Sequence, residues 1–260
     1  MSAPISRAHD RLVSLLAEDP CVRIDEFGGE FYLDSRSSLF RRVIEQGAYE
    51  PELTRVCLDL VDLDGDVLDI GANVGFHSVL FGKRLRKGRV LAVEPMPRAI
   101  GRLRRNLERN GVESKVALYE GVATSEPGEL TIRTIVGREE FSSLGSLTHP
   151  SVIGSPVETV AVKASTVDAL VASFDLKPKF MKVDVEGCEH LVMRGAGQVL
   201  SEFRPIVLAE LSDPLLRSNG SSAAEVIRLM QDKGYRVVDP LRPGSPPGLR
   251  PFGDILCTPE

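Results

Sequence analysis

Residues 66–75 read Asp-Val-Leu-Asp-Ile-Gly-Ala-Asn-Val-Gly, and this stretch decides the fold. The apolar run from Val67 to Ile70 predicts a buried strand, and it ends at the glycines 71 and 75. Glycine has no Cβ atom, so the backbone can bend sharply there and a ligand can approach closely. Residues 75–86 then fit a helix, whose first turn offers unpaired N–H groups. The stretch therefore predicts a strand, a tight glycine turn and a helix that together bind a small ligand.

The strand that follows supplies an acidic residue. Residues 89–94 are rich in apolar side chains and end in Glu94-Pro95. A carboxylate about twenty positions after a glycine turn can accept hydrogen bonds from ribose hydroxyls. The turn reads G-x-N-x-G, whereas a dinucleotide pyrophosphate calls for G-x-G-x-x-G. S-adenosylmethionine has no phosphate, and backbone groups together with Asp69 can hold its aminoacyl end. We therefore favour S-adenosylmethionine over NAD; an ordinary turn with two glycines is the alternative.

Strands and helices alternate from residue 66 onward, which predicts an α/β fold with helices on both faces of a mostly parallel sheet. We expect a Rossmann-like sheet of seven strands in which the last strand inserts antiparallel. The expected strands lie at 66–70, 89–94, 115–122, 180–185, 205–211, 235–238 and 254–258. The expected helices lie at 75–86, 97–110, 166–174, 189–200 and 223–233.

Two segments depart from this alternation. Residues 129–136 and 158–163 alternate apolar and polar side chains, which predicts an inserted antiparallel hairpin with one wet face. Between them, residues 137–156 are rich in serine and glycine and are expected to be irregular. Such a long irregular stretch often has a function, and Phe141, Leu144 and Leu147 could contact a large substrate there.

Residues 1–65 are expected to form an N-terminal helical extension that caps the domain at 66–260. Apolar residues at helical spacing predict helices at 37–46 and 52–61, and a further short helix is expected at 10–17. A small hairpin is expected at 26–33, around the two glycines 28 and 29.

Composition narrows the class of protein. The net charge of −5 is spread along the chain and argues against a nucleic-acid binder, which normally presents a basic face. No apolar run approaches the length needed to span a membrane. The four cysteines show neither metal-ligand spacing nor a disulfide pattern. We expect a cytoplasmic protein, a monomer or homodimer, that binds small molecules.

Charged residues also lie at the ends of two other strands. Lys182 and Asp184 share one side of the strand at 180–185, and Glu210 ends the strand at 205–211. Ligands of open α/β sheets bind beyond the carboxyl ends of the strands. We therefore expect these residues to converge with Asp69 and Glu94 on one site.

Two uses of these residues suggest themselves. Asp184 and Glu210, with water and a substrate hydroxyl, would suit Mg²⁺. Lys182, with a pKa depressed by burial, could then remove the hydroxyl proton, so that Lys182 and Asp184 form the catalytic pair. The alternative is a structural Lys182–Asp184 ion pair that orders the strand ends and touches the cofactor.

Four motifs occur in the order expected for one family. They are Gly-Ala-Tyr-Glu-Pro-Glu at 47–52, the stretch 67–75, Val-Glu-Pro at 93–95, and Met-Lys-Val-Asp-Val-Glu-Gly at 181–187 with Glu189. On these residues the chain resembles the class I S-adenosylmethionine-dependent methyltransferases and, more narrowly, the FkbM family. The resemblance implies an O-methyltransferase that acts on a hydroxyl of a sugar, glycolipid or polyketide. It leaves the catalytic base unassigned.

The resemblance also implies roles in cofactor binding. The methionine part would lie on Gly71, Asn73 and Gly75, the ribose on Glu94, and the aminoacyl end near Tyr49 and Glu50. The complete set of expected cofactor-binding residues is Tyr49, Glu50, Asp69, Gly71, Ala72, Asn73, Gly75, Phe76, Glu94, Pro95, Met96, Val122 and Asp184.

Within the family, the length and N-terminal region are similar to the macrolide 31-O-methyltransferases of the tacrolimus and rapamycin type. A macrolide hydroxyl is therefore the expected acceptor, and a sugar or glycolipid hydroxyl is the alternative. Two other classes of function stay open. An NAD-dependent oxidoreductase is disfavoured because the dinucleotide glycine pattern is missing. A non-catalytic nucleotide-binding module is disfavoured because such a module does not need charged residues at its strand ends.

Overall fold

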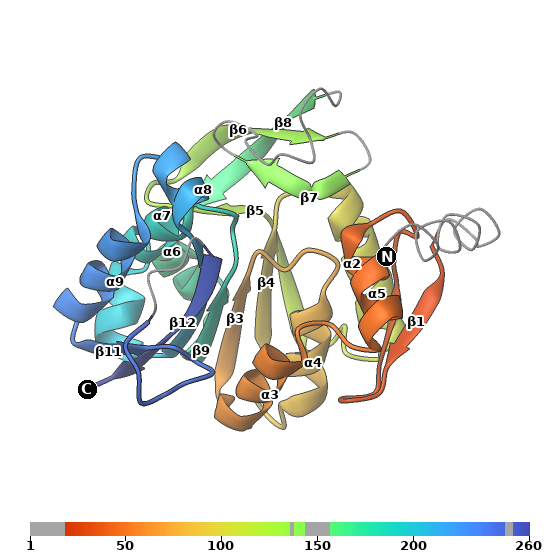
Figure 1. The fold of residues 1–260 in the computed structure, drawn as a ribbon, viewed down its shortest axis with the longest axis horizontal. Helices are drawn as coiled ribbons and strands as arrows, with labels where there is room; N and C mark the ends of the chain where they lie inside the picture. Colours follow the sequence, from red (N-terminus) through yellow and green to blue (C-terminus); the bar gives the residue numbers. More distant parts are fainter. Residues whose placement is uncertain (1–18, 136–137, 144–156, 248–251) are drawn as a thin grey trace, which may run out of the picture.

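A mixed sheet with helices on both faces forms the centre of the computed structural model, which describes residues 19–135, 138–143, 157–247 and 252–260 (Figure 1). The strands of this sheet are β3 (Asp66–Ile70), β4 (Val90–Glu94), β5 (Val116–Ala123), β6 (Gly128–Ile135), β7 (Arg138–Ser143), β8 (Val157–Ser165), β9 (Pro178–Val183), β10 (Ile206–Ser212), β11 (Tyr235–Val238) and β12 (Phe252–Pro259). Across the described part of the chain their order is β11-β12-β10-β9-β3-β4-β5-β8-β6-β7.

The central strands β10, β9, β3, β4 and β5 pair in parallel, which confirms the predicted α/β class. Parallel strands are covered on both faces, and their sequences are therefore nearly continuous apolar runs. Strand β4 is an example, because all five of its residues are buried. Strand β12 lies between β10 and β11 and is antiparallel to both, as predicted for the last strand.

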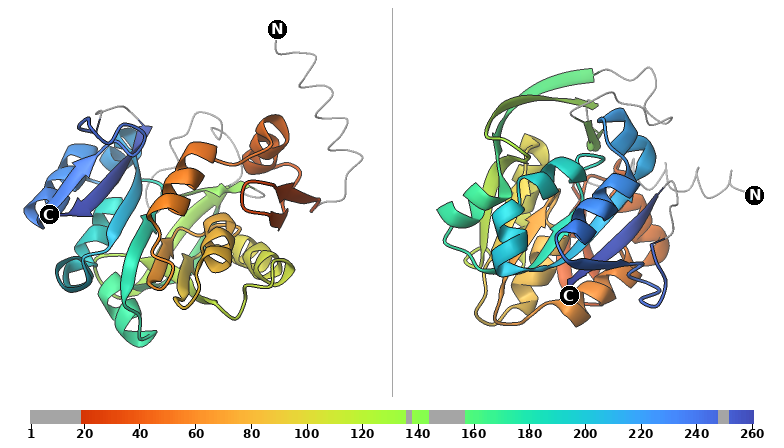
Figure 2. Two further views of the ribbon diagram at one scale, coloured as in Figure 1. Left: turned by 90° about the horizontal axis from the view of Figure 1, so that it is seen from below. Right: turned by 90° about the vertical axis from the view of Figure 1, so that its left-hand side faces the viewer.

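Two layers of helices cover the sheet (Figure 2). The helices are α2 (Ser38–Gln46), α3 (Pro51–Leu60), α4 (Phe76–Arg84), α5 (Pro97–Arg109), α6 (Val167–Ser173), α7 (Glu189–Arg194), the π-helix η2 (Val199–Phe203), α8 (Asp213–Ser218) and α9 (Ala223–Asp232). Helices α6, α7 and α9 share one apolar core with one face of the sheet. Helices α2 to α5 share a second core with the other face. Helix α8, which starts at Asp213-Pro214, was not predicted.

The sheet is larger than the seven strands predicted, because β8, β6 and β7 continue it beyond β5. Strand β8 pairs in parallel with only the last three residues of β5, Gly121 to Ala123. Strands β6 and β8 then pair antiparallel, which confirms the predicted hairpin. Residues 138–143 were expected to be irregular but form β7, and residues 144–156 lie outside the described residues. The extension thus starts at the carboxyl end of β5.

The N-terminal segment packs on the core of helices α2 to α5. Its hairpin consists of β1 (Cys21–Ile24) and β2 (Gly29–Tyr32), so the first strand lies earlier than predicted and the turn precedes Gly29. Phe31, Phe40 and Cys57 are buried in the same core as the strand residue Val67. The helix expected at 10–17 lies outside the described residues.

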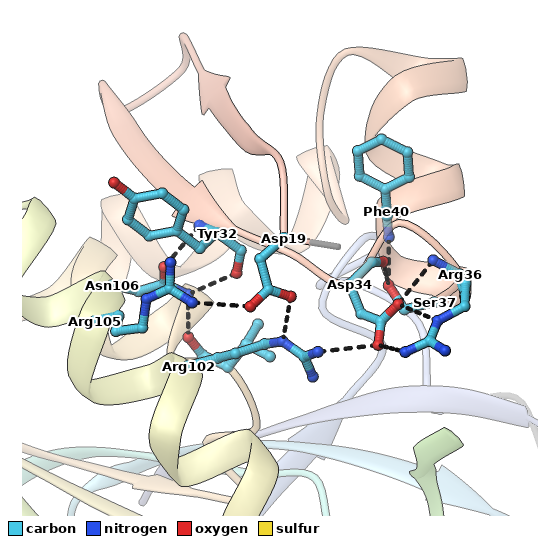
Figure 3. A network of polar contacts seen from close by, with 10 residues as sticks. Asp19, Tyr32, Asp34, Arg36, Ser37, Phe40, Arg102, Arg105 and Asn106 are labelled. Carbon is cyan, nitrogen blue, oxygen red and sulfur yellow. Dashed lines mark hydrogen bonds and ion pairs between the residues drawn. The ribbon is translucent and has the colours of Figure 1, made fainter. Parts of the chain in front are cut away.

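Ion pairs join this segment to α5 (Figure 3). The Arg102 guanidinium donates to Asp19 at 3.0 Å and to Asp34 at 2.9 Å. Arg105 also donates to Asp19, at 2.8 Å. Burial alone would raise the pKa of Asp34, but hydrogen bonds from Arg36 and the charge of Arg102 outweigh it and lower that pKa. These contacts fix the hairpin on the helix that follows β4.

The helix predicted at 189–200 is broken after Arg194. A Cβ atom at Gly195 would lie 2.0 Å from the carbonyl oxygen of Thr124, so only glycine permits this contact between two backbones. Because Thr124 follows β5, far away in the sequence, the pattern of residues 189–200 alone could not reveal the break.

This contact predicts opposite effects for two glycine substitutions. Gly195→Ala should lower the free energy of unfolding by about 1–3 kcal/mol, because the added methyl group overpacks a site bounded by backbone. Gly101→Ala should raise it by up to about 1 kcal/mol, because Gly101 lies inside α5 and a Cβ atom there meets nothing within 4 Å. Urea unfolding of both variants measures the difference. Equal effects would contradict the close approach at Gly195.

Candidate active site

Charged residues lie in one row where the central strands end. Ile70 pairs with Val93 on one side and Val183 on the other, and Ala209 also pairs with Val183. The residues that directly follow Ile70, Val93, Val183 and Ala209 are Gly71, Glu94, Asp184 and Glu210. Glu210 also pairs with Asp254 of the neighbouring strand β12. The strand order therefore brings together the carboxylates that the sequence analysis expected to converge.

The glycine turn needs its glycines for two reasons. Gly71 and Gly75 have φ values of 86° and 87°, in the left-handed region. A Cβ atom at Gly71 would also lie 1.8 Å from the backbone oxygen of Asp184. The N–H groups of Gly71 and Ala72 both donate to the Val93 carbonyl at 3.0 Å, which holds the turn against β4.

Glu94 joins this turn to the loop after β4. Its carboxylate accepts the N–H of Asn73 at 2.8 Å and the N–H of Met96 at 2.9 Å, one on each oxygen. A carboxylate offers roughly four lone-pair positions, so two remain to accept further hydrogen bonds. Burial raises the pKa of Glu94 to about 7, although the two N–H groups oppose this. Ribose hydroxyls could use these positions.

Asp69 provides a buried acceptor atom. Its Oδ2 accepts a hydrogen bond from the Ser78 hydroxyl, whereas its Oδ1 has no partner among the described residues, and the side chain is 0% exposed. A buried carboxylate oxygen without a donor is costly. The ammonium group of an S-adenosylmethionine aminoacyl end would supply such a donor. The glycine turn, Glu94 and Asp69 together therefore fit this cofactor.

Lys182 forms an ion pair with Asp184, and their Nζ and Oδ2 atoms are 3.0 Å apart. Burial alone would lower the pKa of Lys182, but the carboxylates of Asp184, Asp69 and Glu50 outweigh it and raise that pKa above its usual value. The expected depression of the Lys182 pKa is therefore wrong. A lysine with a raised pKa keeps its proton at neutral pH, which does not fit a base. The ion pair of the alternative interpretation is present, and a catalytic role of Lys182 and Asp184 stays a prediction.

Four more carboxyl groups surround this ion pair. The charge of Asp184, together with burial, raises the pKa of Glu210 to about 9. Burial and neighbouring carboxylates raise the pKa of Glu186 to about 8 and that of Asp254 to about 7. Burial likewise raises the pKa of Glu50. In this acidic cluster (Glu50, Glu186, Glu210 and Asp254), Glu186 and Glu210 therefore hold protons at neutral pH.

The expected Mg²⁺ site finds no support here. Among the described residues, no group of three or more histidine, cysteine, aspartate or glutamate side chains is arranged to hold a metal ion. Asp184 already binds the Lys182 ammonium, and Glu210 holds a proton at neutral pH. A metal ligand must be deprotonated, so binding of Mg²⁺ would first have to remove the Glu210 proton, and the role of these two residues as metal ligands stays a prediction.

Aromatic side chains line the start of α4. The ring of Phe76 lies 4.9 Å from the ring of Tyr49 and 5.0 Å from that of Phe31. Glu50 follows Tyr49 at the beginning of α3 and has a φ of 47°. The N-terminal segment thus brings both expected residues to the glycine turn. The neighbouring His77 is buried, and burial keeps its pKa well below 6.5, so its imidazole is neutral.

The remaining expected cofactor residues lie beside Glu94. Pro95 and Met96 follow it directly, and Met96 is 3% exposed. Val122, near the end of β5, packs on the small apolar cluster that contains Met96. These three residues could contact the adenine ring, which stays a prediction.

The sequence analysis missed two members of the site. The sequence analysis gave Asp254 no role, although it lies in the predicted last strand. The antiparallel insertion predicted for that strand could have indicated that Asp254 lies beside Glu210, with which it pairs. Ser78, the partner of Asp69, lies one position beyond His77 and gave no signal of its own.

Comparisons with known proteins show the family of this chain. The methyltransferase FkbM domain model matches residues 69–237, which is well over half of the chain. The chain belongs to the FkbM methyltransferase family. Hexuronic acid methyltransferase AglP of Haloferax volcanii is 26% identical over 228 residues, and the match covers 82% of this chain and 86% of that protein. Methyltransferase sdnD of Sordaria araneosa is 26% identical over 222 residues, with 75% of this chain and 84% of that protein covered.

Among solved structures, the methyltransferase FkbM from Methylobacillus flagellatus KT gives a TM-score of 0.48 at 16% identity, covering 77% of this chain and 45% of that chain. Membership of the family identifies the chain as an S-adenosylmethionine-dependent methyltransferase and removes the NAD-dependent oxidoreductase alternative. None of the helices in the described part of the chain is long and apolar enough to cross a bilayer.

The acidic cluster predicts how stability depends on pH. Glu210 has a pKa of about 9 in the folded protein and an ordinary value of 4.5, so between these values the folded state binds the extra proton. Stability of the unliganded protein should therefore fall as the pH rises from about 5 to 9. Glu210→Gln should flatten this fall, whereas Glu113→Gln, at an exposed glutamate, should not. Thermal unfolding across this pH range measures both; equal slopes would contradict the raised pKa.

Proposed function

We propose that this protein is an S-adenosylmethionine-dependent O-methyltransferase that methylates a hydroxyl of a natural product, with a macrolide polyketide as the first acceptor class. The row of strand ends at the glycine turn carries the proposal. In this row a cofactor turn and Glu94 lie next to an aspartate, Asp184, that is held by a charged lysine. A cofactor site and a polar group for the acceptor thus occupy neighbouring strands.

The cofactor residues act by binding and orienting. When bound, S-adenosylmethionine supplies a methyl group on a sulfonium sulfur. Glu94 would accept the ribose hydroxyls, and Asp69 Oδ1 the ammonium group, which gives this buried oxygen its missing donor. Gly71 and Asn73 would let the methionine part approach the backbone. The carboxylates Asp69 and Asp184 would also favour the positive charge of the sulfonium.

Asp184 is the residue that would act on the acceptor. Its carboxylate would accept the hydrogen bond of the acceptor hydroxyl and then its proton, as the oxygen bonds to the methyl carbon and the carbon–sulfur bond breaks. The Lys182 ammonium, 3.0 Å away, keeps Asp184 in one orientation. Most of the rate enhancement would come from this alignment of oxygen, carbon and sulfur.

The acidic cluster favours acceptors that carry no negative charge. Burial, with the negative charge of Asp184, raises the pKa values of Glu50, Glu186 and Asp254, and for Glu210 the charge of Asp184 is the larger cause. A carboxylate-bearing acceptor would add another negative charge, whereas a neutral hydroxyl compound would not. This favours a macrolide over a sugar acid. A sugar or glycolipid hydroxyl stays the second candidate, because the Haloferax volcanii relative is named as a hexuronic acid methyltransferase.

Calorimetric titration with S-adenosylhomocysteine, followed by an acceptor screen, tests the proposal. We expect one saturable site and methyl transfer to a macrolide or neutral sugar hydroxyl. Asp184→Asn should lower kcat by about a hundredfold or more, the usual contribution of a general base, while changing the cofactor Kd only slightly. Lys182→Met should also lower kcat, because Asp184 loses its orientation. Asp232→Asn, at an exposed aspartate that ends α9, serves as the control.

Three other outcomes are informative. Normal turnover in both Asp184→Asn and Lys182→Met would remove this pair from the mechanism. Cofactor binding without transfer to any hydroxyl acceptor would favour a non-catalytic module or a different methyl acceptor. A folded wild-type protein that does not bind S-adenosylhomocysteine would reject the proposal.

A further inference from the structure

Asn106 of α5 and Asn110, which caps the C-terminus of that helix, pair with the outer edge of strand β2. Asn110 accepts the N–H of Glu30 at 2.9 Å and donates to the Glu30 carbonyl at 2.7 Å. Asn106 accepts the N–H of Tyr32 at 2.7 Å and donates to the Tyr32 carbonyl at 3.4 Å. The two side-chain amides thus take the place of a neighbouring strand.

This pairing follows from helix and strand dimensions. Residues four apart on a helix lie about 6 Å apart along its axis, and residues two apart on a strand lie about 6.7 Å apart. Asn106 and Asn110 on α5 therefore match Glu30 and Tyr32 on β2. In these hydrogen bonds to β2 the two asparagines have equivalent roles, and such bonds contribute only to stability.

They differ in their second amide hydrogen bond. The Asn110 amide donates to the carbonyl of Asn106, within its own helix, at 2.8 Å. The Asn106 amide instead donates to the carbonyl of Val74 at 2.8 Å. Val74 lies inside the glycine turn, between Asn73, whose N–H binds Glu94, and Gly75, which caps the N-terminus of α4. Asn106 is 0% exposed, so solvent cannot replace this bond.

Helix α5 also contacts the turn next to this bond. A Cβ atom at Gly75 would lie 2.9 Å from the Leu103 side chain, which is one helical turn before Asn106. The same helix holds the N-terminal segment through Arg102, as Figure 3 shows for Arg102, Asn106 and Tyr32. Asn106 is therefore the side chain that bonds to the hairpin and to the glycine turn at once.

We propose that Asn106 is a positioning residue for the cofactor, acting through the Val74 carbonyl to hold the glycine turn in its binding conformation. The inference rests on the proposed function, because it takes residues 71–75 as the cofactor turn. Without this bond the Val74 carbonyl would be buried and unpaired, and the turn would gain freedom that cofactor binding must remove.

A matched pair of variants tests this inference. Asn106→Asp and Asn110→Asp keep size and acceptor oxygens but lose the amide donors, and only the first loses the bond to Val74. We expect Asn106→Asp to weaken S-adenosylhomocysteine binding roughly tenfold or more, the usual cost of an unpaired buried carbonyl, and Asn110→Asp to weaken it less than twofold. The KM for S-adenosylmethionine should rise likewise, while kcat at saturation stays near the wild-type value.

Equal cofactor affinities in the two variants, both folded, would overturn the inference while leaving the proposed function intact. Absence of binding to wild-type protein would overturn both. Amide hydrogen exchange of the wild-type protein covers the case in which Asn106→Asp does not fold. Bound S-adenosylhomocysteine should slow exchange at Tyr32, whose N–H binds Asn106, more than at Glu30, whose N–H binds Asn110. Equal slowing would again contradict the coupling.

Discussion

The close approach of two backbones, at Gly71 and at Asp184, is the constraint on which the site depends. The distance of 1.8 Å between a hypothetical Cβ atom at Gly71 and the Asp184 oxygen leaves no room for any side chain. Because of this contact, β3 and β9 end side by side, and the turn after β3 lies next to the aspartate after β9. The proposed cofactor turn and the proposed acceptor-binding aspartate are therefore neighbours in the folded sheet.

Electrostatics gives the site its second property. One charged lysine lies among carboxyl groups from five separate segments of the chain, and its charge is balanced mainly by Asp184, Asp69 and Glu50. Glu186 and Glu210 keep their protons at neutral pH, because burial and the negative charge of Asp184 both disfavour their ionised forms. In the proposed function, a site of this kind would favour a positively charged sulfonium cofactor and a neutral acceptor. Its chemistry thus depends on the balance of the whole cluster rather than on a single residue.

Much of the fold could be predicted from local sequence, and the reasons are physical. The strand and turn at 66–75 follow from an apolar run and from glycines that permit positive φ values. The convergence of strand ends follows from the general topology of parallel sheets. Long-range contacts could not be predicted in this way. The direction of the Lys182 pKa shift depends on Asp69 and Glu50, which lie far away in the sequence. The helix break at Gly195 depends on the carbonyl group of Thr124, in the loop after β5.

The pairing of α5 with β2 has a consequence for how the protein behaves in a crowded solution. A two-stranded hairpin normally leaves the N–H and C=O groups of its outer edge open to any other extended chain, and such edges promote aggregation. Here the outward-facing groups of Glu30 and Tyr32 are occupied by Asn110 and Asn106. A helix thereby shields a sheet edge, and the hairpin cannot recruit a foreign strand along that edge unless α5 moves away.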